Sequence, residues 1–334
     1  MKQASSVCTT APAELQSLYW VVRAELDEVE AMLRDELRSD FPFVDRLVQH
    51  GFRLGGKRLR PALLLLCGRA CGQLKPGHRT LAVVAELIHT ATLIHDDVLD
   101  EAALRRHLET VNARWDNEAS VLLGDYLFAR AMCLATSVND IYVCRVLAEA
   151  TKQMCEGELR QVGSRGDYDL TEKQYLGIIG DKTAALCACC CRLGAHWAGA
   201  DEALQDSLAR YGHHLGIAFQ ITDDVLDVNG SEAVTGKSLG TDLIKQKPTL
   251  PVIRLLQEVR GEERVEVLEL LSRTDGRARE GLKPWLERWD AVSYAEQTAL
   301  VHARRAEEAL KEVPAGPARR ALAELAEFVV TRRQ

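Results

Sequence analysis

The sequence lacks an excess of positive charge. Its 334 residues include 42 Lys and Arg against 49 Asp and Glu, a formal net charge of −7 at pH 7. A protein that binds nucleic acid regardless of base sequence needs a basic surface that neutralises phosphates. The composition therefore predicts that nucleic acid is not a partner, although a local basic cluster can still bind a small phosphorylated substrate.

Long apolar runs are missing as well. The longest ones, at 62–67 and 83–94, are too short or are interrupted by Glu86 and His89, whereas about 20 apolar residues are needed to cross a bilayer. Residues 1–10 have no apolar core of the kind found in a signal peptide. We therefore expect a cytoplasmic protein that does not span a membrane.

Proline is absent between Pro76 and Pro248, although the chain has nine prolines in all. That stretch is rich in helix-forming residues and lacks the alternation of β-branched residues that marks strands. The pattern predicts helices at 12–38, 57–70, 79–99, 112–136, 141–162, 171–199, 202–227, 293–313 and 317–332, with shorter ones after Pro251. No linker rich in Pro, Gly or Ser divides them, so we expect one all-α domain over residues 1–334.

Cysteine, in contrast, is common. Four of the ten cysteines crowd into Cys187, Cys189, Cys190 and Cys191, a spacing without a Cys-x-x-Cys pair. Structural zinc sites need paired ligands with workable geometry. We therefore interpret these cysteines as reduced, small core residues of a helix.

Two of the predicted helices, at 79–99 and 202–227, are too apolar to be ordinary surface helices, and each ends in a group of aspartates. The first group is Asp96, Asp97 and Asp100, and the second is Asp223, Asp224 and Asp227. Positions i and i+4 share one helix face about 6 Å apart, so the first and last member of each group can point to one place. Because acids at a helix C-terminus repel one another and oppose the helix dipole, the arrangement is costly without a cation.

Hard divalent cations such as Mg²⁺ take oxygen ligands and often bind through one or two carboxylates together with substrate phosphates. A single acidic group of this kind is usually a solvated helix end. Two nearly identical groups at the ends of two apolar helices are much harder to explain in that way. The pair predicts a diphosphate held through Mg²⁺ between two acidic clusters.

A diphosphate site also needs cations and hydrogen-bond donors. The segment 55–61 carries Lys57 and Arg60 near an apparent helix start, where anions are favoured. His89 lies two helical turns before Asp96 on nearly the same face. Further candidates are Arg105, Arg106, Lys182, Thr183, Lys237 and Lys247. Each of these is weak evidence alone, because such residues are most often solvated surface.

Together and in this order, the motifs resemble the trans-polyprenyl diphosphate synthase family. The resemblance covers 55–251 and extends more loosely to the C-terminus, where 327–330 followed by Arg332 and Arg333 is also similar. It implies an all-α isoprenoid synthase fold with a deep central cavity, three Mg²⁺ ions and a homodimer.

The resemblance also assigns roles by position. Mg²⁺ on the allylic diphosphate is assigned to Asp96, Asp97 and Asp100, and a further ion to Asp223 with Asp224 and Asp227. Isopentenyl diphosphate is assigned to Lys57, Arg60, His89 and Arg106. The allylic diphosphate is assigned to Arg105, Lys182, Thr183, Gln220, Lys237 and, as a weaker candidate, Lys247. The residues expected to be catalytic are Asp96, Asp97, Asp100, Lys182 and Asp223.

The sequence departs from the family pattern at two places. After Arg106 the family commonly has Gly-Lys-Pro, whereas this chain has His107, Leu108 and Glu109. Before Lys247 a glycine is usual, whereas this chain has Gln246. Both positions are in expected loops, so we expect changed loop dynamics rather than lost activity.

The chemistry that the family performs fits these residues. Mg²⁺ and cationic side chains stabilise the charge that develops on the leaving diphosphate, so the allylic carbon–oxygen bond ionises. The isopentenyl double bond then attacks the allylic cation, and a proton is lost to the departing diphosphate, which accounts for the lack of an obvious His–Asp or Ser–His base pair. An apolar cavity that excludes water keeps the cation from being quenched.

Product length is expected to depend on the helix at 79–99. Short-chain members of the family commonly have an aromatic residue about one turn before the first aspartate, whereas Ala91 and Thr92 are small. We therefore expect a tunnel that continues past this level, with a floor at Phe128 or Met132, and a product longer than C20. An aromatic residue at position 91 should shorten the product. The alternative is that Ala91 and Thr92 only permit close helix packing.

Four other interpretations remain open. A short-chain synthase would make a C15 or C20 product. A terpene cyclase also ionises a prenyl diphosphate, but it typically has one aspartate-rich motif and needs no isopentenyl site. A non-catalytic synthase subunit tends to lack the acidic ligands. A purely structural helical protein leaves the aspartate groups unexplained.

Overall fold

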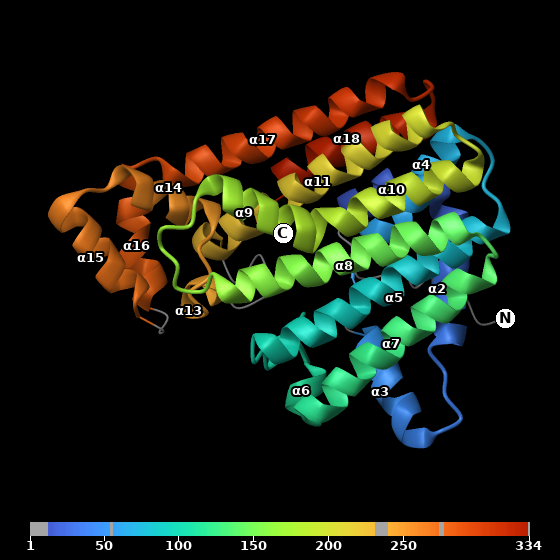
Figure 1. Cartoon of the computed structure of the whole chain (residues 1–334), viewed down its shortest axis with the longest axis horizontal. Coiled ribbons are helices and arrows are strands. Elements are labelled where there is room, and N and C mark those ends of the chain that lie inside the picture. The colour runs from blue at the N-terminus through green and yellow to red at the C-terminus, as the bar shows by residue number, and fades with distance from the viewer. Residues whose placement is uncertain (1–12, 54–55, 231–239, 274–276, 333–334) are drawn as a thin grey trace. The chain divides into compact units, whose positions relative to one another are not determined.

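The computed structural model describes residues 13–53, 56–230, 240–273 and 277–332. Within these residues the protein is helical except for one two-stranded hairpin, so the predicted all-α fold is confirmed (Figure 1). The elements are α1 (Ala13–Leu18), η1 (Trp20–Val22), α2 (Arg23–Glu36), α3 (Pro42–Arg53), α4 (Leu59–Cys71), α5 (Pro76–Leu99), β1 (Leu104–Arg105), β2 (Leu108–Glu109), α6 (Val111–Arg114), α7 (Asn117–Ser137), α8 (Ile141–Gly163), α9 (Glu172–Ile179), η2 (Gly180–Ala184), α10 (Ala185–Ala198), α11 (Glu202–Asn229), α13 (Thr241–Ile244), α14 (Leu250–Glu258), α15 (Gly261–Leu271), α16 (Arg277–Arg288), α17 (Ala291–Ala309), η3 (Leu310–Glu312) and α18 (Pro317–Thr331).

The chain divides into two compact units. Unit 1 comprises 1–146, 190–208 and 312–325, and unit 2 comprises 147–189, 209–311 and 326–334. The helices α8, α10, α11 and α18 each contribute residues to both units. The single domain over residues 1–334 stays a prediction.

In unit 1, α5 is the most buried long helix. From Leu81 to Ile88 every residue is buried, including Glu86, and α5 packs against α2, α4 and α7 (Figure 1). The predicted central helix is thus confirmed, three residues longer at its start because Pro76 begins it. Proline is favoured there, since the first helical residue has no intrahelical partner for an N–H. Cys190 and Cys191 of α10 are buried in the same unit, as expected for small core residues.

The helix α7 is the one described helix long and apolar enough to cross a membrane, judged by length and composition alone. This helix was not expected to be long and apolar enough for that. One of its faces, with Leu123, Leu127 and Ala131, is buried. The helix packs along α5 within unit 1 (Figure 1).

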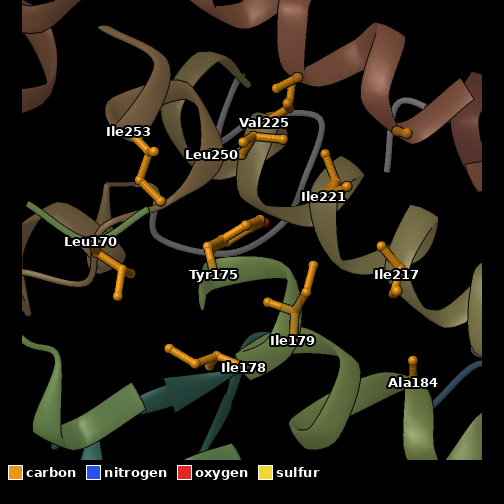
Figure 2. Close-up of a cluster of buried hydrophobic side chains, with 12 residues drawn as sticks. Leu170, Tyr175, Ile178, Ile179, Ala184, Ile217, Ile221, Val225, Leu250 and Ile253 are labelled. Atoms are coloured by element: carbon orange, nitrogen blue, oxygen red, sulfur yellow. The ribbon is translucent and has the colours of Figure 1, made fainter. Parts of the chain in front are cut away.

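In unit 2, buried side chains from α9, α11, α14 and α17 form an apolar cluster. Figure 2 shows Tyr175 and Ile179 of α9 directed toward the α11 residues Ile221 and Val225. Leu250 of α14 joins the same cluster. The cluster fixes α9 against the end of α11 that carries the second group of aspartates.

Three predicted helices are interrupted. The helix expected at 112–136 is divided into α6 and α7, because Asp116 begins a new helix by accepting the N–H of Ala119 at 2.7 Å. The one expected at 12–38 is divided near Tyr19. The one expected at 171–199 contains the π-helical turn η2. The helix α3 and the hairpin were not predicted.

Two histidines are packed together in unit 2. The Nδ1 atoms of His214 on α11 and His302 on α17 are 3.2 Å apart, and His302 is 6% exposed. Burial lowers the pKa of each ring to about 4, and the positive charges of Arg305 and of protonated His213 lower both values further. Because a pKa of about 4 is well below pH 7 and below the ordinary value of 6.5, both rings are neutral in the folded protein at pH 7.

We expect the free energy of unfolding to decrease as the pH falls from about 6.5 toward about 4. In this window the unfolded chain binds protons on both rings that the folded chain does not, so acid favours unfolding. Allowing for the partial exposure of His214, the loss is about 1–3 kcal/mol. Urea unfolding at pH 7 and pH 5 should show a smaller decrease for His302→Gln than for the wild type. His107→Gln, at an exposed loop histidine, is the control, and equal decreases in all three proteins would contradict the assignment.

Candidate active site

The first group of aspartates occupies the last turn of α5, in unit 1. Asp96 and Asp100 are partly exposed, whereas Asp97 is 2% exposed. The helix ends here, with the N–H of Asp100 donating to the carbonyl of Asp96 at 2.8 Å. The two partly exposed carboxylates therefore share the negative end of a helix, where a cation is favoured.

Asp97 points to a different partner from its neighbours. Arg105 of β1 donates to both Asp97 oxygens, with Nε at 2.9 and 3.1 Å and Nη2 at 2.8 Å. Burial raises the pKa of Asp97, and the ion pair with Arg105 partly opposes this rise. A residue predicted to bind metal and a residue predicted to bind the allylic diphosphate are thus joined to each other.

The turn of the hairpin after Arg105 is unusual. Arg106 and His107 both have positive φ, at 53° and 63°. The left-handed conformation is easiest for glycine, and a side chain there costs of order 1 kcal/mol. This gives a physical reason for the glycine that the family commonly has at the position of His107.

A basic cluster forms around His89, also in unit 1. A Cβ atom at Gly56 would lie 2.5 Å from Nη2 of Arg106, so the guanidinium rests against the bare backbone beside Lys57. Burial is the largest cause that lowers the pKa of His89 well below its ordinary value. The positive charges of Arg60, Arg106, Arg105 and Arg58 lower this pKa further. The structure therefore brings the segment at 56–60, Arg106 and His89 together, as the proposed isopentenyl site requires.

Arg60 within this cluster has a buried Nε that donates to none of the described residues. Buried polar groups in folded proteins are usually hydrogen-bonded. A donor of this kind in a basic cluster is suited to an anionic oxygen, and a diphosphate has several.

The second group of aspartates lies near the end of α11, in unit 2, and its members have different partners. Asp223 accepts from Nη2 of Arg332 at 2.7 Å. Asp227, 2% exposed, accepts from the Thr241 hydroxyl and from the backbone N–H of Asp242, both at 3.2 Å. Asp223 is therefore the most exposed of the group, with a side chain 30% exposed.

A chain of hydrogen bonds connects the second aspartate group to η2. Thr183 donates to Gln220 Oε1 at 2.9 Å, and Gln220 Nε2 donates to Asp224 at 2.8 Å. The Tyr175 hydroxyl donates to the other Asp224 oxygen at 2.6 Å. Burial, with the nearby Asp242 carboxylate, raises the pKa of Asp224 to about 8, and the two hydrogen bonds oppose this rise. Asp224 thus orients Gln220 and Thr183.

Lys182 lies in the π-helical turn η2, between α9 and α10. Its Nζ donates to Gln161 at 2.9 Å and pairs with Glu158, both on α8. A Cβ at Gly157 would clash with the backbone N of Lys182, so this glycine lets η2 approach α8. π turns often occur at functional sites, and this one displaces Lys182 from a regular helical position.

The remaining predicted residues are less well connected to these groups. Lys247 is 8% exposed, with Nζ 4.0 Å from Asp242. Gln246 before it has a φ of 53°, which explains the usual glycine there as it does at His107. Lys237 lies outside the described residues.

The residues expected to control product length lie on α5 and α7. Ala91 is 2% exposed, and Thr92 is partly exposed one turn before Asp96. On α7, Phe128 is 37% exposed and Met132 is partly exposed. Thr92 therefore shares the Asp96 face of the helix, whereas Ala91 is packed.

Four residues with close contacts to these groups were given no role from the sequence. They are Arg58, Glu86, Tyr175 and Arg332. Glu86 had a visible signal, since it is an acid inside an otherwise apolar helix. Arg332 was noted only as similar to the family, and Tyr175 had no signal, because its partner Asp224 is 49 residues away.

The donor set suits a hard divalent cation. Among the described residues, no group of three or more His, Cys, Asp or Glu side chains is placed to hold a metal ion. The fit rests on Asp96 and Asp100, which are carboxylates on one face at a helix C-terminus. Oxygen ligands of this kind are those that Mg²⁺ prefers.

Comparisons with known proteins agree with one another. A family model described as polyprenyl synthetase matches residues 42–287. Octaprenyl diphosphate synthase of Escherichia coli strain K12 is 36% identical over 321 residues, covering 95% of this chain and 99% of that protein.

Solved structures are similar over nearly the whole chain. A decaprenyl diphosphate synthase from Rhodobacter capsulatus has a TM-score of 0.89 at 37% identity, covering 96% of this chain and 99% of the other. A polyprenyl synthase from Caulobacter crescentus CB15, complexed with calcium and isoprenyl diphosphate, has a TM-score of 0.91 at 35% identity, covering 96% and 98%.

Proposed function

Because this chain belongs to the polyprenyl synthetase family, we propose that it condenses isopentenyl diphosphate with an allylic prenyl diphosphate and makes an all-trans product longer than C20. The family and the enzyme class, a prenyltransferase, were both predicted from the motifs, and both predictions are confirmed. The long product is supported by the octaprenyl and decaprenyl names of the similar proteins.

The observation that carries the proposal is the neighbourhood of α5 in unit 1. One helix presents Asp96 and Asp100 at its end and His89, within the basic cluster, two turns earlier. Two diphosphate substrates require two kinds of site. One is an acidic group that binds a diphosphate through Mg²⁺, and the other is a basic group that binds a diphosphate directly. A terpene cyclase needs only the first.

Substrate binding is divided among these residues. Lys57, Arg60, His89 and Arg106 bind isopentenyl diphosphate. Arg105, Lys182, Thr183, Gln220, Lys237 and Lys247 bind the allylic diphosphate. Asp96 and Asp100 hold Mg²⁺ on the allylic diphosphate, with Asp97 fixing Arg105 beside them. Asp223, supported by Asp224 and Asp227, holds a third ion.

Mg²⁺ supplies positive charge that stabilises the leaving diphosphate. Lys182 adds a cation from η2, and Thr183 and Gln220 supply donors whose directions are fixed through Asp224. His89, neutral because of its lowered pKa, donates a hydrogen bond rather than a charge to isopentenyl diphosphate. The proton released after carbon–carbon bond formation goes to the departing diphosphate.

The test is consumption of labelled isopentenyl diphosphate by the purified chain with Mg²⁺ and an allylic primer. We expect primer-dependent incorporation that EDTA abolishes. Conversion of the primer without isopentenyl diphosphate would favour a cyclase. No reaction by the chain alone, with activity restored by a second protein, would favour a synthase subunit.

We also propose a cytoplasmic homodimer in which a second copy covers the outer face of α7. Val121 and Leu122 are 43% and 60% exposed there. A lipid environment fits this helix poorly, because Asp125 is exposed and Arg130 is paired with Glu36 of α2 at 2.7 Å. An apolar face interrupted by charges suits a protein partner.

Leu122→Glu should weaken the dimer by roughly tenfold or more, because it introduces a charge into an apolar interface. Sedimentation velocity over a range of protein concentrations measures this. Val265→Glu on α15 is the matched control, since Val265 is 56% exposed and is not part of α7. A wild-type chain that sediments as a monomer, or equal behaviour of both variants, would contradict the interface.

A further inference from the structure

The segment that carries Lys57 and Arg60 is anchored by Arg58, which follows Lys57 in the chain. Arg58 caps the start of α4 with a φ of 53°, a left-handed conformation that a side chain other than glycine adopts at a cost. Strain of this kind persists where surrounding contacts hold it, and it is concentrated at functional sites. The contacts that hold Arg58 are therefore informative.

Two carboxylates from different helices bind the Arg58 guanidinium. Nη1 donates to Glu86 of α5 at 2.6 Å, and Nε donates to Glu30 of α2 at 3.0 Å. The guanidinium also lies 5.2 Å from the ring centroid of Phe52 on α3. Burial alone would lower the pKa of Arg58, but Glu86 and Glu30 raise it above its ordinary value. Arg58 is thus a permanently charged side chain held by three helices.

Glu86 is placed to transmit this anchoring to the basic cluster. It is 2% exposed, and it precedes His89 by three residues, so both lie on one side of α5. Its Oε2 has no hydrogen-bond partner among the described residues, so its role depends on Oε1 and Arg58. The Tyr19 hydroxyl donates to the carbonyl of Lys57 at 3.2 Å and is a further contact that holds this backbone.

We propose that Arg58 and Glu86 are positioning residues that hold Lys57 and Arg60 at a fixed distance from His89 and so set the affinity for isopentenyl diphosphate. Paired with two carboxylates, the Arg58 guanidinium does not itself bind the diphosphate. Its ion pairs fix the entry of the chain into α4, and α5 carries the other half of the cluster. The inference rests on the proposed function.

The test is isothermal titration of isopentenyl diphosphate alone, without primer, into the wild type and variants. Glu86→Gln should weaken this binding about tenfold or more, because a small displacement of convergent cations loses several contacts at once. The KM for isopentenyl diphosphate should rise equally, whereas the KM for the allylic diphosphate should stay within about twofold. Arg58→Lys keeps the positive charge but lacks the planar guanidinium. Its affinity for isopentenyl diphosphate should lie between that of the wild type and that of Arg58→Gln.

The matched control is Arg79→Gln. Arg79 of α5 pairs with Glu28 of α2, so this ion pair joins the same two helices away from the basic cluster. It should leave isopentenyl diphosphate binding within about twofold of wild type. Should Glu86→Gln fail to fold, Glu30→Gln is the second variant. It removes the other carboxylate that pairs with Arg58, and the Glu30 side chain is less buried, at 18% exposed.

The outcomes separate the two claims. If Glu86→Gln and Glu30→Gln bind isopentenyl diphosphate as tightly as the wild type does, the inference is overturned and the proposed function stays in place. Equal weakening for both substrates, together with a lower melting temperature, also overturns it, because that is the result of a purely structural ion pair. A wild-type chain that binds no isopentenyl diphosphate contradicts the proposed function and the inference together.

Discussion

We expect Asp96→Asn to lower kcat by about 10³-fold or more and to raise the Mg²⁺ concentration needed for half-maximal activity. The metal contributes several kcal/mol of charge stabilisation to the leaving diphosphate, and each 1.36 kcal/mol corresponds to about tenfold in rate. Asparagine keeps the size of the side chain and one oxygen but removes the negative charge. Steady-state rates across a Mg²⁺ titration measure both effects.

Asp97→Asn distinguishes the two kinds of aspartate in the first group. Since both Asp97 oxygens accept from Arg105, this variant should weaken allylic diphosphate binding and lower thermal stability, with little change in the Mg²⁺ midpoint. Asp35→Asn on α2, an exposed carboxylate, controls for the loss of one charge. Equal Mg²⁺ midpoints for Asp96→Asn and the wild type would contradict the assignment of Asp96 to the metal.

We expect Thr92→Phe to shorten the longest product to C20 or less. Thr92 is partly exposed on the Asp96 face of α5, so an aromatic ring there meets the growing chain one turn beyond the allylic diphosphate. Ala91→Phe should also shorten the product, but Ala91 is 2% exposed, and a ring at a packed position costs stability of about 1–3 kcal/mol. Product sizing and thermal unfolding of both variants separate blockage from misfolding.

Ala91→Leu is the control for packing at position 91, since it adds volume without a ring. An unchanged product distribution in both Phe variants, with intact folding, would contradict the tunnel along α5. In that case the small residues only allow close helix packing.

Much of the fold could be predicted because proline, apolar periodicity and helix propensity act locally. The all-α class and the long helices α5, α8 and α11 follow from these signals. The breaks were harder to see. In the sequence Asp116 resembles any polar residue of a helix, and only the structure shows that its carboxylate accepts the N–H of Ala119. The π turn at 180–184 packs closely against α8 because Gly157 has no side chain there.

The composition of the site was easier to predict than its internal contacts. Motif order pointed to both aspartate groups and to the basic residues around His89. It gave no indication that Asp97 faces Arg105 or that Asp224 accepts from Tyr175, since helix periodicity places a residue on a face but does not name its distant partner. The two departures from the family pattern, His107 and Gln246, gained their meaning only from their positive φ values.

The most direct test of the central claim is to size the products that the purified chain makes from labelled isopentenyl diphosphate, Mg²⁺ and a farnesyl or geranylgeranyl diphosphate primer. We expect a ladder of dephosphorylated products that extends beyond C20 and disappears with EDTA. A ladder that stops at C20 would keep the prenyltransferase and reject the open tunnel past Ala91 and Thr92. No incorporation of isopentenyl diphosphate at all would contradict the proposed function.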